Sequence, residues 1–327
     1  MIKVSVLVSV YNGEKYLNTC LDSLERQTYK NIEIICINDG STDSTPDIMR
    51  SRMMKDSRIK LVEHYPNKGL AVALNEGLKA CTGDVIAYLD SDDWFADDSI
   101  ERLVTVFDNH DDADCVLLKC IFVFPDGRQE EYKGLKFDSI DGMAAFKESL
   151  TWNVHGIYAA RRELYERCKF DAACKHFSND NTTRIHYFMS RKVYSSDAPY
   201  FYFQNPDSIT YQVSIRRMDY MRATESMKKQ LEKLGSSLEI LSLYENERWK
   251  IVVDCYLFYF KNRKLLSKDE RAYCLKELKR GLRSIDTSLL DTSLTNKLGF
   301  CPLGKCWTFF RIEEELYFWL KKITGRL

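Results

Sequence analysis

The chain has 327 residues, of which 45% are hydrophobic and 29% are charged, and its formal net charge is zero. This composition supplies enough apolar surface for a large packed core, so it excludes a disordered chain and favours one large α/β domain with an extension. No run of about 18 or more apolar residues occurs, so the sequence predicts no membrane-spanning helix.

The charge is unevenly distributed along the chain. Residues 1–212 contain 25 Lys and Arg against 33 Asp and Glu, a net charge of −8, whereas residues 213–327 contain 23 against 15, a net charge of +8. We expect metal chemistry in the acidic half. The basic half is either a solvated helical surface or a face for anionic lipid or an anionic acceptor.

The N-terminus and the cysteines predict a cytoplasmic protein. The stretch MIKVSVLVSVYN alternates and has no small-residue cleavage site, which indicates a buried strand and not a signal peptide. The eleven cysteines are scattered and include no CxxC pair, which is typical of free thiols in a reducing compartment.

Strand and helix patterns alternate four times in the first part of the chain. Buried strands are expected at 4–10, 32–37, 59–62 and 84–89. Helices are expected at 14–26, after a Ser44 or Thr45 cap, at 69–80, and at 99–108, where Asp98 and Glu101 suit a capping box. We therefore interpret Asp97 and Asp98 as structural. The alternation predicts a parallel sheet with right-handed crossovers.

The pattern changes along the rest of the chain. Further strands are expected at 115–124 and 192–194, a hairpin turn at 126–127 with a return at 130–133, and helices at 141–150 and 180–190. Beyond about residue 215 long helices dominate, at 217–234, 239–262, 268–283 and 305–323. We place a domain boundary at 212, with a nucleotide-binding half at 1–110, an acceptor half at 111–212 and a helical region at 213–327.

Polar residues follow three of the predicted strands and are expected to meet at one edge of the sheet. Tyr11, Asp39 and the run from Asp90 to Asp93 come directly after buried strands, and ligands bind beyond the carboxyl ends of strands in such sheets. Asp90 and Asp92 can hold a hard divalent cation that bridges a diphosphate. Asp39 can accept hydrogen bonds from a base or ribose, and Tyr11 can stack on a base.

Four motifs in order, VSVLVSVYN, NDGSTDST, NKGL…ALNEG and YLDSDDW, resemble the family 2 glycosyltransferases, which have the GT-A fold. The resemblance covers residues 2–110 strongly and 150–212 loosely. It implies a GT-A (Rossmann-like), mostly parallel sheet flanked by helices. It also implies a nucleotide site, which Ser9 and Tyr11 line, where Asp39 recognises the base and Lys68 lies near the phosphates or base. Asp90 and Ser91 would lie near the ribose and diphosphate, and Asp92 would bind Mg2+ or Mn2+.

The resemblance also implies a catalytic base. The family has an acidic pair opening a later helix, and Asp180 takes its second place, with Asn179 where Glu is usual. Phe203 and Asn205 align with a usual Arg and His, so a cation is missing and a possible metal ligand, Asn205, is an amide. The family's usual Arg-Asn after the third motif is Leu74-Asn75 here. Trp152, Asn153 and His155 fall where the acceptor side of the active site usually forms in this family. Trp152 either stacks on a sugar ring or packs against the rest of the protein.

The leading interpretation is therefore a metal-dependent, inverting glycosyltransferase that uses a UDP-sugar and a glycan or lipid-linked glycan acceptor, in bacterial surface polysaccharide or glycan synthesis. The alternatives are a non-catalytic nucleotide-sugar-binding subunit and a sugar-phosphate nucleotidyltransferase. Sugar-phosphate nucleotidyltransferases carry a Gly- and Arg-rich loop after the first strand, and this sequence has YNGEKYL there instead. A dinucleotide oxidoreductase is not favoured either, because no GxGxxG follows the first strand. We expect no nucleic-acid partner, and a homodimer stays open.

The last predicted helix, 305–323, has aromatic and aliphatic residues on much of one face, followed by Lys321, Lys322 and Arg326. This pattern suits a helix in a membrane interface, which would place the protein at the inner face of the cell membrane. It equally suits a helix docked on the protein body or on a second subunit, and Glu313 to Glu315 oppose anionic lipid.

Overall fold

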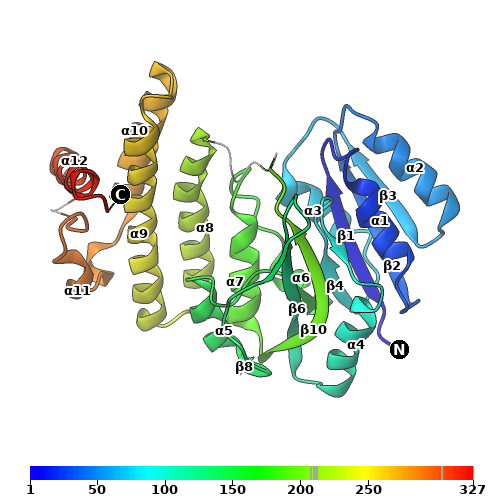
Figure 1. Cartoon of the computed structure of the whole chain (residues 1–327). Helices are drawn as coiled ribbons and strands as arrows, with labels where there is room; N and C mark the ends of the chain where they lie inside the picture. Colours follow the sequence, from blue (N-terminus) through cyan, green and yellow to red (C-terminus); the bar gives the residue numbers. More distant parts are fainter. Residues whose placement is uncertain (207, 209–212, 303–304, 327) are drawn as a thin grey trace. The chain divides into compact units, whose positions relative to one another are not determined.

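The computed structural model describes residues 1–206, 208, 213–302 and 305–326, and the chain divides into two compact units (Figure 1). The first contains residues 1–175 and 179–211, and the second contains residues 176–178 and 212–327. The expected boundary at residue 212 lies outside the described residues.

Four parallel strands form one half of the sheet in the first unit, as the sequence predicts. They are β1 (Val4–Val10), β2 (Ile32–Asp39), β3 (Ile59–His64) and β4 (Val85–Tyr88), in the order β3-β2-β1-β4. Every residue of β1 and β2 is buried, because strands inside a parallel sheet are covered on both faces. The connecting helices are α1 (Leu17–Glu25), α2 (Thr45–Lys55) and α3 (Leu70–Leu78).

The described part of the sheet continues from β4 through strands of mixed direction. The order is β4-β9-β6-β10-β5, with β9 (Tyr158–Arg161) antiparallel to both neighbours and β6 (Ala113–Val123) parallel to β10 (Lys192–Phe203). The short strands β5 (Trp94–Phe95) and β8 (Ser139–Asp141) pair with β10, and β7 (Gln129–Glu131) forms the predicted hairpin with β6. The fold is therefore the expected mostly parallel sheet.

The later helices of this unit are α4 (Ser99–Asn109), α5 (Gly142–Ser149), α6 (Arg162–Arg167) and α7 (Asn179–Met189). The predicted capping box on α4 is wrong, because its side chains have other partners. Asp98 makes no side-chain cap bond and pairs with Arg102 at 2.6 Å, and Glu101 accepts a hydrogen bond from Thr28 at 2.6 Å. Asp97 pairs with Arg26, so Asp97 and Asp98 both form surface ion pairs, and their structural interpretation stays a prediction.

The second unit consists of helices around its own core. These are η2 (Ile215–Asp219), α8 (Tyr220–Lys233), α9 (Leu238–Asn262), α10 (Lys268–Ser284), η3 (Thr287–Leu289), α11 (Thr292–Thr295) and α12 (Trp307–Ile323). Trp249 and Tyr256 of α9 pack against Phe310 and Phe318 of α12. Within the described residues, no helix is long and apolar enough to cross a membrane.

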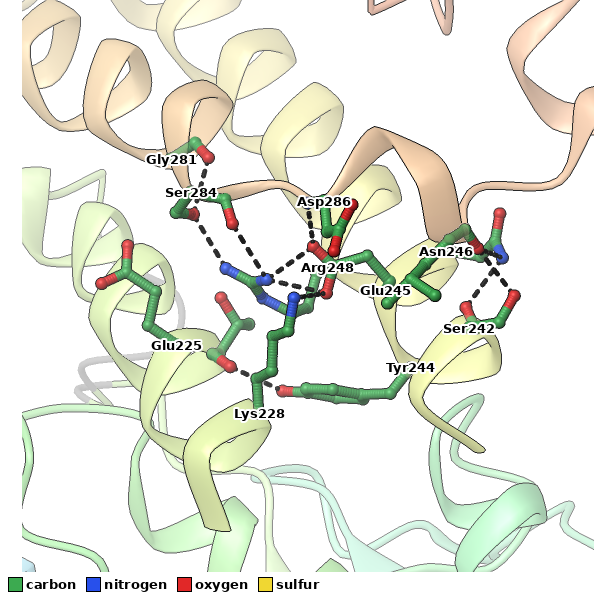
Figure 2. A network of polar contacts seen from close by, with 12 residues as sticks. Glu225, Lys228, Ser242, Tyr244, Glu245, Asn246, Arg248, Gly281, Ser284 and Asp286 are labelled. Atoms are coloured by element: carbon green, nitrogen blue, oxygen red, sulfur yellow. Dashed lines mark hydrogen bonds and ion pairs between the residues drawn. The ribbon is translucent and has the colours of Figure 1, made fainter. Parts of the chain in front are cut away.

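A buried network of charges connects three helical segments of this unit (Figure 2). The Glu245 carboxylate, with no exposed surface, accepts two hydrogen bonds of 2.8 Å from Arg248 Nη1 and one of 2.6 Å from the Asp286 backbone N–H. Lys228 Nζ lies 3.0 Å from the same carboxylate, and Arg248 donates to Ser284 Oγ at 2.8 Å. The network satisfies these buried charges where α8, α9 and the end of α10 meet.

Candidate active site

The ends of β1 and β2 are joined by side-chain to backbone hydrogen bonds, which shape one rim of the sheet. The Asn12 N–H donates to Ser41 Oγ at 3.0 Å, and the Thr42 N–H donates to Asn12 Oδ1 at 2.8 Å. Tyr11, at the tip of this rim, is 54% exposed, whereas Ser9 is buried in the last part of β1. The exposed ring of Tyr11 can therefore stack on a planar ligand. The buried Ser9 can contact a ligand only where that ligand reaches the end of β1.

Asp39, the last residue of β2, is buried and fully engaged with the turn that precedes α3. Its carboxylate accepts hydrogen bonds from the backbone N–H groups of Lys68 and Gly69, at 2.8 and 2.9 Å, and from Asn67 Nδ2 at 2.9 Å. It therefore fixes the 67–69 turn, which is a task the sequence did not suggest. Its predicted contact with a base stays a prediction.

Lys68 has a fixed backbone and a free side chain. Its N–H binds Asp39, while its ammonium group is exposed and makes no hydrogen bond or ion pair with any residue that the structure describes. A cation presented in this way beside a strand-end rim can contact a phosphate.

The acidic run after β4, Asp90 to Asp93, contains one residue that is bound to the sheet and others that are partly exposed. Asp93 is buried and bound to β10, since it accepts hydrogen bonds from the Tyr200 hydroxyl at 2.6 Å and from the Phe203 N–H at 2.8 Å. Asp93 therefore anchors the run to the sheet. Asp90 accepts a hydrogen bond from the Tyr88 hydroxyl, and Asp92 and Ser91 are partly exposed.

Asn205 lies beside Asp92 although 113 residues separate them in sequence. Its Nδ2 donates to Asp92 Oδ2 at 2.9 Å, and its Oδ1 lies 3.4 Å from the Tyr16 hydroxyl, which donates to it. Phe203, which replaces the family's usual cation, packs against the rings of Tyr16 and Trp94. The structure thus brings together two of the three predicted metal residues and places Phe203 in an aromatic cluster.

The oxygen atoms of Asp90, Asp92 and Asn205 fit a hard divalent cation in chemical type. Burial of the carboxyl group, and then the negative charge of the nearby Asp92, raise the pKa of Asp90 to about 7. A bound cation would offset both effects. No group of three His, Cys, Asp or Glu that could hold a metal occurs among the described residues. A bound ion would therefore need the Asn205 amide oxygen, with the amide turned around, and ligand oxygens.

Asp180 lies in the first turn of α7 and is partly exposed. Burial of the carboxyl group raises its pKa, and the Arg184 guanidinium opposes that effect. The carboxylate makes no hydrogen bond or ion pair with the residues that the structure describes, so it is free to accept a proton from a ligand. Asn179 is the first residue of the same helix.

Trp152 is held by α7 and by the segment that follows β7. The guanidinium carbon of Arg184 lies 4.8 Å from its ring centroid, and the Tyr132 hydroxyl donates to its carbonyl oxygen. The indole remains 41% exposed, and its backbone φ is 61°. The same loop, through Asn153 and His155, borders a cavity of about 640 Å3 between β6, β10 and residues 131–139.

Sequence reasoning missed Asn67, Tyr88, Tyr200 and Arg184, which hold or flank the predicted residues. Asn67 and Tyr88 belong to the quoted motifs, so their positions could have been considered. Tyr200 is brought to the acidic run only by strand pairing, which no local pattern specifies. Arg184 could have been found as the residue one helical turn after Asp180.

Acidic and hydroxyl-bearing side chains thus lie at the carboxyl edge of an α/β sheet, which is where ligands bind in folds of this kind. Crystal structures of S. aureus TarS support the same architecture: residues 1–349 of that protein with UDP superpose with a TM-score of 0.73 at 19% identity, covering 97% of this chain and 91% of that one. Mannosyltransferase PcManGT from Pyrobaculum calidifontis, with GDP-Man and Mn2+, gives 0.52 at 17% identity and 86% coverage of each chain.

The chain belongs to the glycosyl transferase family 2, whose model matches residues 5–169. The putative glycosyltransferase EpsH of Bacillus subtilis is 44% identical over 123 residues, which cover 38% of this chain and 35% of that relative. The chain thus spans about a third of this relative's length.

Proposed function

We propose that the protein is an inverting glycosyltransferase that moves a sugar from a UDP-sugar to an acceptor hydroxyl. The observation that carries this proposal is the pairing of Asp92 with Asn205 at the rim, beside Asp90 and the ends of β1 and β2. Family 2 membership supports the reaction class. The likeness to TarS bound to UDP and to UDP-GlcNAc supports the choice of a uridine donor.

The donor is bound along the rim. Tyr11 stacks on the base, Asp39 and its 67–69 turn face the base edge, and Ser9 lines the strand end. Lys68 reaches the phosphates with its free ammonium group, and Ser91 and Asp90 contact ribose and diphosphate. Lys68 can supply the cation that the family usually has at the position of Phe203, as can a residue of the basic C-terminal part.

Mn2+ or Mg2+, held by Asp90, Asp92 and Asn205, would neutralise charge on the diphosphate leaving group. Asp180 accepts the proton of the acceptor hydroxyl while its oxygen forms a bond to the anomeric carbon. The bond between that carbon and the diphosphate breaks in the same step, and its electron pair leaves with UDP. A single displacement of this kind inverts the anomeric configuration.

The proposed acceptor is a glycan or lipid-linked glycan of a bacterial surface polysaccharide. The second candidate function, a non-catalytic nucleotide-sugar-binding subunit, is favoured by the Asn179 and Phe203 departures. UDP release from UDP-glucose, UDP-galactose and UDP-GlcNAc separates the two. An enzyme releases UDP from at least one of them, whereas a binding subunit binds UDP without turnover.

We also propose that α12 contacts an anionic lipid surface. Its outward face presents an apolar stripe, with exposed fractions of 47–60%, formed by Phe309, Ile312, Leu316, Trp319 and Ile323. The opposite face, with Phe310 and Phe318, packs into the helical core. The helix is thus docked on its own unit and still has an uncovered amphipathic face.

Charge around the stripe favours lipid as its partner. Glu313 and Glu314 are buried on the docked side and Glu315 pairs with Arg263, so the acidic residues do not oppose an anionic surface. Lys322 and Arg326 are exposed at the end of the stripe. Each basic group near an anionic membrane contributes about 1 kcal/mol.

A further inference from the structure

Asp180 and Arg184 lie one turn apart on α7, but no hydrogen bond or ion pair joins them. Side chains four residues apart lie on the same face of a helix and usually attract when oppositely charged. On α4 the same spacing brings Asp98 and Arg102 to 2.6 Å. On α7 neither Asp180 nor Arg184 makes a hydrogen bond or ion pair with any described residue, and Arg184 Nε is buried without a partner.

The reason is that Arg184 is held by an aromatic ring. Its guanidinium lies over Trp152, a residue with positive φ, which is a conformation that costs free energy in a bulky side chain and persists only when its surroundings enforce it. The Tyr187 hydroxyl donates to the His155 carbonyl at 2.6 Å, and a side chain at Gly156 would meet Thr183 at 3.3 Å. The loop that carries Trp152 is therefore packed along α7.

The three side chains offer complementary chemistry on one side of α7. Asp180 accepts hydrogen bonds, Arg184 donates them in a planar fork, and the exposed part of the Trp152 indole provides an apolar face. An acceptor with neighbouring hydroxyl groups satisfies all three. One hydroxyl donates to Asp180, the adjacent oxygen accepts from Arg184, and the C–H face of the molecule packs on the ring.

We propose that Asp180, Arg184 and Trp152 form the acceptor subsite, and that Arg184 selects sugar or polyol acceptors with a second hydroxyl beside the attacking one. This inference rests on the proposed function, because it assigns the attacking hydroxyl to Asp180. In this subsite Arg184 is the specificity-determining residue, and Trp152 positions it.

The test uses the full chain with Mn2+ and the UDP-sugar, among UDP-glucose, UDP-galactose and UDP-GlcNAc, that gives the fastest UDP release. The acceptor probes are methyl glucoside, methyl galactoside, methyl N-acetylglucosaminide and ribitol, together with a deoxy analogue of the best probe. Arg184→Met keeps an unbranched chain over Trp152 and removes the N–H donors. Arg26→Met, which removes an exposed arginine paired with Asp97, is the matched control.

We expect Arg184→Met to raise the KM for the best probe by at least about tenfold, because a hydrogen bond to a charged group is lost. Its affinity for UDP in calorimetry should equal that of the parent. The difference in KM between parent and variant should be smaller for the deoxy analogue than for the full probe. Three results would overturn the subsite. The first is an unchanged KM for Arg184→Met, and the second is a loss of UDP affinity as large as the rise in KM. The third is that no acceptor probe stimulates UDP release by a protein that does turn over its donor. Absence of UDP release from all three donors would instead contradict the proposed function.

Discussion

Asn205 donates a 2.9 Å hydrogen bond to Asp92 across 113 residues of sequence, and this contact joins the end of β10 to the acidic run after β4. It brings a third oxygen-bearing side chain to the two carboxylates that the motif supplies. The candidate metal site is therefore assembled by the sheet, and not by the motif alone.

Replacing Asp92 with Ala should abolish sugar transfer while the melting temperature stays close to that of the parent. A partly exposed rim carboxylate contributes little to packing, but its loss removes a proposed metal ligand. Asp47→Ala, at an exposed carboxylate on α2, is the control. Near-normal UDP release by Asp92→Ala in the presence of a chelator would exclude the metal role.

Asp180→Asn should lower turnover by about 100-fold or more, because it keeps the side-chain shape and removes the proton acceptor. UDP affinity should not change, and Asp126→Asn on the exposed 126–127 turn should behave as the parent does. Equal turnover of Asp180→Asn and parent would refute the assignment. A product that retains the donor's anomeric configuration would rule out single displacement.

Glu245→Ala should destabilise the protein by about 3–5 kcal/mol, because it leaves the buried Arg248 and the partly exposed Lys228 without their shared partner. Glu247→Ala, which breaks only the neighbouring pair with the half-exposed Lys250, should cost about 1 kcal/mol or less. Urea unfolding of both variants measures the difference. Similar midpoints for the two would show that the network in Figure 2 adds no stability.

Glu314 should make stability fall as pH rises. Burial, and then the Glu313 charge, raise the pKa of Glu314 from its ordinary value of 4.5 to about 9, and both its oxygens are buried without hydrogen bonds from described residues. The folded state thus holds this proton more tightly than the unfolded state does, so its contribution is fully present below about pH 4.5 and is lost as pH rises through about 9.

Glu314→Gln should remove this slope and stabilise the protein near neutral pH by about 3 kcal/mol. Urea unfolding across the acid to alkaline range measures the effect, with Glu315→Gln, at the half-buried pair with Arg263, as the control. Parallel pH profiles for the Glu314→Gln protein and the parent would contradict the prediction.

The apolar stripe of α12 should bind anionic vesicles weakly and in a salt-sensitive manner. Deleting residues 305–327 would also remove Phe310 and Phe318 from the core, so the triple change Ile312→Ser, Leu316→Ser and Trp319→Ser is the cleaner variant. It should lose sedimentation with phosphatidylglycerol vesicles at low salt, whereas Leu238→Ser, at an exposed position on α9, should not. A parent that ignores vesicles but is a dimer broken by the triple change would identify a second copy as the partner.

The sequence predicts the first parallel strands well, because the buried apolar runs in β1 and β2 are strong local signals. It does not predict β9, a four-residue strand whose alanines carry no clear pattern, or the pairing of Tyr200 with Asp93. The capping box on α4 failed because Asp98 and Glu101 found partners outside that motif. Local patterns cannot specify contacts that depend on strand pairing, such as the hydrogen bond from Asn205 to Asp92 and the one from Tyr200 to Asp93.

Calorimetry of UDP binding measures whether this strand-end rim is a uridine nucleotide site. UDP should bind more tightly than GDP or CDP, Mn2+ should strengthen binding, and Asp92→Ala should remove the effect of the metal. Tighter binding of GDP would overturn the uridine assignment. Failure of all three nucleotides to bind, with or without Mn2+, would contradict the proposal that this rim is a nucleotide-sugar site.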